Sequence, residues 1–197
     1  EHYRGLLLKV VDQTQRRVFN GESVPAAEKI VSLFEPHTDI IVKSFRDVQY
    51  GHKINLATER RGFVTYLSIE EGNPADASLY LPVLKACQQD YQLTPHSVVA
   101  DGCYASQANV HSARVLGAKR TVFNKPAGLG LHDMGVKKKT FDALRDFRAG
   151  IEGNISELKR AFGLSRATWK GYDGFLAYVW SSVLSYNLVR RVRFSSA

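Results

Sequence analysis

The chain has 197 residues, of which 44% are hydrophobic and 23% charged, and its formal net charge at pH 7 is +8. This length is sufficient for one domain with a substantial core. The sequence contains no run of about 18 apolar residues of the kind that spans a membrane. Cys87 and Cys103 are too few for a disulfide framework or a Cys-rich zinc site, so we expect reduced thiols in a cytoplasm.

The first residues predict a helical segment and not a secretion signal. The stretch EHYRGLLLKVVDQTQRRV begins with an acidic residue, and Lys9 and Asp12 interrupt its apolar patch. Its apolar residues recur at helical spacing, and a second, short helix is expected around Glu28–Leu33. Because the chain has no initiating Met and residues 1–35 carry no chemical motif, we interpret this segment as the end of an insertion or upstream region.

Extended segments follow. Residues 36–44, PHTDIIVKS, suggest a short strand in which Asp39 has the position of a turn or cap residue. Residues 52–59 and 63–71 are two β-rich runs separated by an Arg-Arg-Gly turn, which predicts an antiparallel hairpin. A turn then leads into an amphipathic helix, with Asp76 as a possible N-cap.

The region after residue 96 predicts a βαβ unit. Short apolar runs at 97–100 and 121–123 flank a helix that Gly117 closes, so the two strands should be parallel neighbours with a right-handed crossover. Asp101 then lies at the carboxyl end of the first strand, where open α/β sheets bind their ligands. The alternative is a capping Asp in a βα loop.

Residues 141–162, FDALRDFRAGIEGNISELKRAF, predict a long amphipathic helix. Its apolar residues recur three or four positions apart and form one stripe that should lie on a core: Leu144, Phe147, Ile151, Ile155, Leu158 and Phe162. Residues 126–140 contain three glycines and three consecutive lysines, and they predict an exposed loop. Residues 176–194 predict an apolar helix with a cationic end, and Trp180 on it is expected to belong to the core.

A strip of charge runs beside the apolar stripe of the 141–162 helix. Arg148, Glu152 and Lys159 lie within about 40° of one another around the helix, so a carboxylate is held between two cations. The simplest interpretation is a surface ion pair worth about 0.2–0.5 kcal/mol. However, Gly150 and Gly153 bracket the carboxylate, and each costs about 1 kcal/mol relative to Ala in a helix. Glycine is found there when another backbone, a metal or a phosphate must approach closely.

Positive charge is concentrated in the last third of the chain. Residues 137–197 carry twelve Lys or Arg against five acidic residues, a balance of +7. A basic field of this kind attracts polyanions, of which nucleic acid is the commonest. A basic surface that serves only solubility is the alternative.

An acidic residue at a strand end and another on a late helix can converge on one point above a sheet. Asp101 and Glu152 offer oxygen ligands, which suit Mg²⁺ or Mn²⁺. A pair of such ions about 4 Å apart activates a water or hydroxyl and stabilises the leaving oxygen in phosphodiester displacement. That chemistry normally requires a third carboxylate.

The stretch from Arg148 to Lys159 resembles the signature of DDE transposases of bacterial insertion sequences. In that signature an Arg lies four residues before the catalytic Glu and a Lys lies seven residues after it, as they do around Glu152. The stretches FEPHTDIIVKSFRDVQYGHKINL, GNPADASLYLPVL, VVADGCYAS and RAFGLSRATWKG resemble successive blocks of one branch, the ISNCY-like branch, and together they cover nearly the whole chain.

The resemblance implies a ribonuclease H-like mixed sheet flanked by helices over residues 36–197, with extra helices at both ends. It implies that Asp101 and Glu152 are the second and third catalytic acidic residues and bind two Mg²⁺ or Mn²⁺ ions. The cations expected to support the Glu or bind DNA are Arg148, Lys159, Arg160, Lys137, Lys138, Lys139, Arg166 and Lys170. The family often has a Tyr three residues before the Arg, where this chain has Arg145.

The first catalytic Asp of the family belongs to a strand that we expect upstream of this sequence, and Asp39 is the only early candidate within it. We therefore expect a carboxy-terminal piece of a transposase that cleaves DNA and transfers strands at insertion-sequence ends. An inactive DNA-binding remnant and a ribonuclease H-like nuclease without strand joining are the alternatives. The resemblance further implies DNA as the partner, a homo-oligomer in the active assembly, no membrane, and a cytoplasmic, nucleoid-associated bacterial protein.

Overall fold

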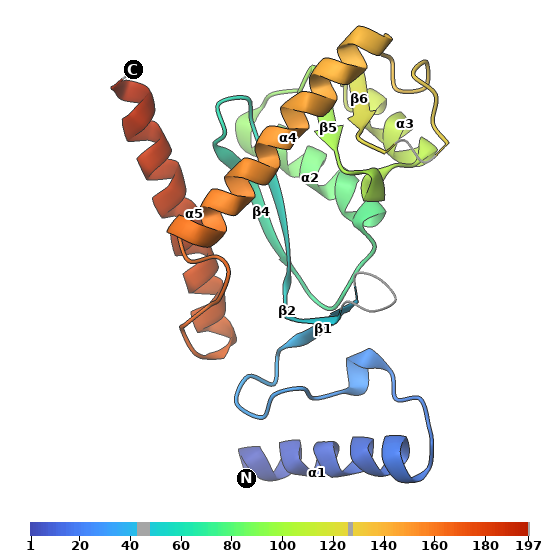
Figure 1. The fold of residues 1–197 in the computed structure, drawn as a ribbon, viewed down its shortest axis with the longest axis vertical. Coiled ribbons are helices and arrows are strands. Elements are labelled where there is room, and N and C mark those ends of the chain that lie inside the picture. Colours follow the sequence, from blue (N-terminus) through green and yellow to red (C-terminus); the bar gives the residue numbers. More distant parts are fainter. Residues whose placement is uncertain (43–47, 126–127, 197) are drawn as a thin grey trace. The chain divides into compact units, whose positions relative to one another are not determined.

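The computed structural model describes residues 1–42, 48–125 and 128–196 (Figure 1). The chain is a mixed α/β protein with helices and small sheets, as predicted. Its contacts divide it into two compact units. The first comprises residues 1–54, 69–73 and 167–181, and the second comprises residues 55–68, 74–166 and 182–197. None of the helices in the described ranges is long and apolar enough to cross a membrane.

The first unit begins with α1 (His2–Thr14), which a π-helical turn at Gln15–Phe19 continues. The predicted short helix at Glu28–Leu33 is wrong, because only a 3-10 turn at Ala26–Glu28 forms there. The side-chain amide of Gln13 explains the difference. It donates to the Ile30 carbonyl at 3.0 Å and accepts from the Ile30 amide at 2.8 Å, so it occupies the backbone groups that a helix would use.

Strand β1 (Asp39–Val42) confirms most of the predicted extended segment at 36–44, whose last two residues lie outside the described ranges. It pairs antiparallel with β2 (Val48–Gly51), and Asp39 lies opposite Gly51. The predicted hairpin is formed by β3 (Lys53–Thr58) and β4 (Val64–Glu70), which pair with each other. A connection this short permits only an antiparallel pair.

In the second unit, α2 (Asp76–Tyr91) follows the hairpin, and its N-cap is Ala75, while Asp76 belongs to the first turn. The predicted βαβ unit is confirmed: β5 (Ser97–Ala100) and β6 (Arg120–Phe123) are parallel, and α3 (Gln107–Val115) connects them. We expected one mixed sheet. Among the described residues, the strands form three separate two-stranded sheets: β1–β2, β3–β4 and β5–β6.

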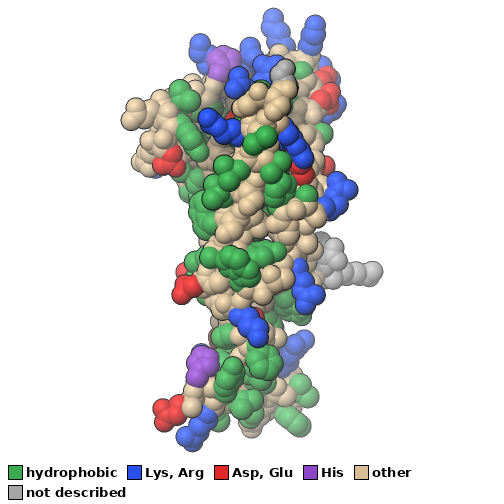
Figure 2. Space-filling model, turned by 90° about the vertical axis from the view of Figure 1, so that its left-hand side faces the viewer, with side chains coloured by type: hydrophobic (Ala, Val, Ile, Leu, Met, Phe, Trp, Pro, Cys, Tyr) green, Lys and Arg blue, Asp and Glu red, His purple; other side chains and the backbone are tan. Residues whose placement is uncertain are grey.

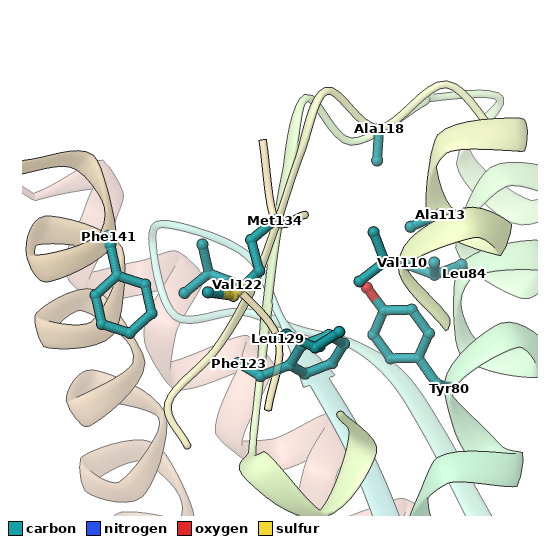
Figure 3. Close-up of a cluster of buried hydrophobic side chains, with 10 residues drawn as sticks. All are labelled: Tyr80, Leu84, Val110, Ala113, Ala118, Val122, Phe123, Leu129, Met134 and Phe141. Atoms are coloured by element: carbon teal, nitrogen blue, oxygen red, sulfur yellow. The ribbon is translucent and has the colours of Figure 1, made fainter. Parts of the chain in front are cut away.

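The core of the second unit surrounds the β5–β6 ladder (Figure 3). Successive side chains of a strand point to opposite faces. Val122 of β6 accordingly lies toward Phe141, while Phe123 contacts the ring of Tyr80 on the other side, with ring centroids 5.6 Å apart. Val122 and Phe123 are both 0% exposed. The ladder is therefore covered by helices on both faces, and the carboxyl ends of its strands lie at the edge of this core.

The exposed loop predicted at 126–140 is wrong in two respects. Met134 is 1% exposed and Leu129 8% exposed, because the described part of this segment folds back onto the core. The Met134 carbonyl accepts a hydrogen bond from the Thr121 amide at 3.1 Å, which fastens the segment to β6. Helix α4 (Lys138–Ala161) also begins earlier than expected. Residues 126–127 lie outside the described ranges.

Helix α4 buries only part of its predicted apolar stripe. Leu158 is 0% exposed and Leu144 packs against the core, but Phe147 is 38% exposed. The helix has 24 residues and is therefore about 36 Å long, while the four-residue strands it covers span only about 13 Å. A helix much longer than the sheet beneath it cannot bury its whole apolar face.

Helix α5 (Gly171–Ser195) contributes residues to both units, and its second-unit part packs on the hairpin through Tyr186, which is 0% exposed. The Asn187 side chain bonds to both the amide and the carbonyl of Val64 at 2.9 Å, so it continues the edge of β4 as a strand would. Trp180 was predicted to be core, but it is 54% exposed. Hydrophobic side chains are likewise exposed among Lys and Arg on the face drawn in Figure 2.

Candidate functional site

Asp101 directly follows β5, as predicted, and its two carboxylate oxygens have different partners. Oδ1 accepts a hydrogen bond from the Gly102 amide at 2.5 Å, which makes Asp101 the N-cap of a short 3-10 helix, Gly102–Tyr104. The same amide also donates to Oδ1 of Asn124, at 2.6 Å. Asn124 directly follows β6, so the carboxyl ends of both parallel strands meet at this one amide. Sequence reasoning did not select Asn124.

Residue 102 must be glycine because Lys125 lies too close for a side chain, and not because of its backbone conformation. A Cβ atom on Gly102 would lie 2.6 Å from Cβ of Lys125 and 2.8 Å from the Lys125 carbonyl oxygen. Since one of these atoms belongs to the backbone, no side-chain rotation could relieve the clash. The glycine therefore allows the ends of β5 and β6 to approach closely enough for the shared hydrogen bond.

Arg148 of α4 connects the two predicted catalytic carboxylates. Its Nη2 lies 2.6 Å from Oδ2 of Asp101, and its Nη1 lies 2.6 Å from Oε1 of Glu152. The Arg148 side chain is 17% exposed, while those of Asp101 and Glu152 are 41% and 65% exposed. Two carboxylates that are 51 positions apart in the sequence thus converge on a single cation.

Both alternative interpretations from the sequence are observed as contacts. Asp101 caps a helix, and Glu152 forms an i,i+4 ion pair. Charge-assisted hydrogen bonds of this length are strong. However, ion pairs as exposed as these contribute only about 0.2–1 kcal/mol each to stability. The arrangement therefore fixes where the side chains point more than it stabilises the fold.

Asp101 and Glu152 have the ligand chemistry that a divalent cation prefers, but two carboxylates are too few for a complete metal site. Their oxygens already converge on a positive group, and carboxylate oxygens are the ligands that Mg²⁺ and Mn²⁺ prefer. Within the described residues, however, no group of three or more His, Cys, Asp or Glu side chains is arranged to hold a metal ion. Asp101 and Glu152 are therefore a partial ligand set.

The predicted basic residues differ in how free they are to bind a phosphate. Lys159 is exposed and forms no ion pair with any residue that the structure describes. Lys138, by contrast, is paired with Asp142 at 2.8 Å. The remaining predicted cations of the second unit are exposed at the start of α4, at its end and in the following turn: Lys137, Lys139, Arg160 and Arg166. Lys170 is exposed and belongs to the first unit.

Gly150 and Gly153 were expected to admit a closely approaching group next to Glu152. A Cβ atom at either position would have no atom of the described residues within 4 Å. Close approach of another backbone segment is therefore wrong for the described part of the chain. The helix surface beside Glu152 is open, and the metal and phosphate alternatives stay predictions.

Asp39 belongs to a different cluster, in the first unit. Its Oδ2 lies 3.0 Å from Nδ1 of His52 and accepts from the Gly72 amide at 2.8 Å. Nε2 of His52 lies 2.7 Å from Nδ1 of His37, whose Nε2 lies 2.8 Å from Oε2 of Glu35. Burial lowers the pKa of His52, although the nearby Asp39 opposes this shift. Asp39 thus serves as a hydrogen-bond acceptor within a Glu-His-His-Asp array.

The sequence did contain a signal for this array. Glu35, His37 and Asp39 alternate in the sequence, and a turn closed by the Thr38 amide and the Glu35 carbonyl at 3.1 Å leads into β1. His52 is brought to them because Gly51, its neighbour, pairs with Asp39 in the β1–β2 hairpin. The pairing could not be read from the sequence, and the array was missed.

The described structure is thus a mixed α/β protein in which two carboxylates, one after a strand and one on a late helix, converge on the Arg148 cation. The chain matches a family model described as "Transposase DDE domain" over residues 43–188. Since the match covers most of the sequence, the chain belongs to this family. Comparisons with curated proteins and with solved structures found no significant match.

Membership of this family indicates a transposase-type nuclease function in DNA transposition, with DNA as the substrate. DDE transposase domains generally use divalent metal ions. The resemblance inferred from the Arg148–Lys159 signature is thereby confirmed for the family.

Proposed function

We propose that this chain supplies Asp101 and Glu152 to the active site of an insertion-sequence transposase of the ISNCY-like branch. Residues 36–197 form part of its ribonuclease H-like DDE domain, and residues 1–35 are the end of an insertion or upstream region. The reaction is DNA cleavage at the element ends followed by strand transfer. The observation that carries the proposal is the convergence of Asp101 and Glu152 on the Arg148 guanidinium, at 2.6 Å each.

In this proposal, Asp101 and Glu152 hold Mg²⁺ or Mn²⁺, which supplies activation of the attacking oxygen and stabilisation of the leaving oxygen. The Gly102 amide orients Asp101 by bonding to Oδ1, and Oδ2, which bonds to Arg148, is the oxygen that would bind an ion. Lys159 and the exposed cations near the ends of α4 bind DNA phosphates. These contacts position the DNA without reading its sequence.

We propose that a third carboxylate comes from a strand that pairs between β3 and β5. Each of these strands has one partner strand among the described residues, which leaves one edge of each without a ladder. Tyr104, just after β5, donates a hydrogen bond to Asn55 of β3 at 2.9 Å, so the two strands are linked within one unit.

A titration of the 197-residue chain with Mn²⁺ tests the ligand assignment. We expect one weak site, because the ligand set is partial, and we expect Asp101→Asn or Glu152→Gln to abolish it. The matched control is Asp146→Asn, which removes an equal charge from an exposed residue of the same helix and should leave the site intact. Binding that survives both ligand changes would refute the assignment, and tight binding of two ions would refute the need for a further strand.

An inactive DNA-binding remnant is the second candidate, because the cap at Asp101 and the Arg148–Glu152 pair are also the contacts of purely structural residues. Metal-dependent nicking by the protein from the complete reading frame separates the two. In a transposase, Glu152→Gln abolishes nicking, whereas in a remnant DNA affinity and its salt dependence hardly change. In a remnant there is no activity to lose. A nuclease of the same fold would nick DNA but would not join strands.

A further inference from the structure

Arg148 bonds to one oxygen of each carboxylate that we propose as a metal ligand. Its guanidinium bonds to Oδ2 of Asp101 and Oε1 of Glu152, while Oδ1 of Asp101 already accepts from the Gly102 amide. A cation bound to both Oδ2 of Asp101 and Oε1 of Glu152 would take the place of the Arg148 guanidinium. At these two oxygens the guanidinium and a divalent ion would therefore compete.

The competition cannot be relieved by deprotonation, because an arginine side chain stays charged at any physiological pH. Arg148 can leave the carboxylates only by rotating its side chain to another acceptor. The planar fork of a guanidinium binds two oxygens of one group, and phosphate is the other group that matches it well. The carboxylates that Arg148 contacts are open to solvent, since the side chains of Asp101 and Glu152 are 41% and 65% exposed.

We propose that Arg148 is an exchangeable cation that couples metal binding to DNA binding. In the metal-free protein it holds Asp101 and Glu152 together; when a divalent ion takes the two carboxylates, Arg148 turns to a DNA phosphate. Each ligand then removes the obstacle to the other, and by thermodynamic linkage the effect on affinity is equal in both directions. The inference rests on the proposed function in one respect, namely that Asp101 and Glu152 are the metal ligands.

The first test compares Mn²⁺ affinities in the absence of DNA. Arg148→Gln removes the competing cation, and the loss of two exposed ion pairs should tighten Mn²⁺ binding by about three- to tenfold. Arg145→Gln is the matched control, since Arg145 lies on the same helix and pairs instead with Asp142 and Asp146. It removes the same charge but frees neither ligand, so its effect should stay below about twofold.

The readout is the broadening of the Gly102 and Gly153 amide signals in NMR spectra by paramagnetic Mn²⁺, compared with that of amides close to Asp142 and Asp146. Equal affinities in Arg148→Gln and Arg145→Gln would refute the exchange, because the effect would then be one of net charge. Weaker binding in Arg148→Gln would also refute it, because Arg148 would then support the metal site. Dispersed amide spectra of each variant show that it is folded.

The second test measures the coupling itself, with a short DNA duplex of arbitrary sequence at fixed salt. The duplex should raise the Mn²⁺ affinity of the unmodified chain, and this increase should be lost in Arg148→Gln but kept in Arg145→Gln. Comparison at one DNA concentration cancels the Mn²⁺ that the duplex itself binds. An increase that is equal in all three proteins would overturn the proposal.

The two proposals fail in different ways. If Asp101→Asn and Glu152→Gln leave Mn²⁺ binding unchanged, the ligand assignment fails and the exchange fails with it. If those variants lose Mn²⁺ binding while Arg148→Gln behaves like Arg145→Gln, the metal site stands and only the exchange is wrong.

Discussion

Two glycine-to-alanine changes in the second unit should shift its stability in opposite directions. In Gly102→Ala the new methyl group would lie 2.6 Å from Lys125 Cβ and 2.8 Å from the Lys125 carbonyl oxygen, so the ends of β5 and β6 must separate. That separation disturbs the Gly102 amide, which donates to Asp101 and to Asn124. In Gly150→Ala the methyl group meets no described atom within 4 Å.

The expected magnitudes follow from these contacts. Overpacking of a filled site costs about 1–3 kcal/mol, and weakening a hydrogen bond to a charged group costs about 1.5–3 kcal/mol. Because one displacement causes both effects, they are only partly additive, and we expect Gly102→Ala to cost about 2–4 kcal/mol. Gly150→Ala removes a glycine from a helix interior and should add about 0.5–1 kcal/mol of stability.

Hydrogen exchange of the Val122 and Phe123 amides measures the opening of this unit directly, since both residues are 0% exposed in β6. Gly102→Ala should accelerate their exchange and Gly150→Ala should slow it. The reasoning is refuted if Gly102→Ala leaves the exchange rates unchanged, or if both variants shift them in the same direction. In the second case the glycine of α4 would have a contact that the described residues do not include.

Two further changes test contacts elsewhere in the chain. Tyr186→Phe removes a buried hydroxyl that donates to the Gly62 carbonyl at 2.9 Å and accepts from Nε of Arg190 at 3.0 Å, so urea denaturation should show a loss of about 1–3 kcal/mol. Burial lowers the pKa of His52 below its unfolded value, so the first unit should lose stability as the pH falls through that lowered pKa. Fluorescence follows this loss, because both tryptophans lie in that unit, and His52→Asn should reduce the pH dependence.

The parts of the fold that depend on residues close together in the sequence could be predicted. The βαβ unit follows from two short apolar runs on either side of a helical period, and Asp101 is placed at a strand end by the run before it. The spacing of Arg148 and Glu152 predicted their ion pair. In each case the signal lies within a few residues of the element that it describes.

The errors concern contacts between distant segments. Nothing near Met134 indicates that its carbonyl accepts from Thr121, and a glycine-rich, lysine-rich composition favoured an exposed loop. Ile30 is withheld from a helix by the side chain of Gln13, which is 17 positions away. Trp180 was assigned to the core as one of the many apolar residues of its helix, but the buried face of α5 contains Val179, Val183 and Tyr186 instead.

The contacts of Arg148 explain why two interpretations of Asp101 and Glu152 were both reasonable. A carboxylate that binds metal in the working enzyme still needs a counter-charge when metal is absent, because two like charges close together repel each other. The bonds to Arg148 and to the Gly102 amide provide that compensation. A helix cap and an ion pair are therefore expected in both cases. Structural carboxylates form them, and so do metal-binding carboxylates when no metal is bound. Competition with a second cation separates the two roles, since a structural pair does not bind Mn²⁺ while a ligand pair exchanges its arginine for it.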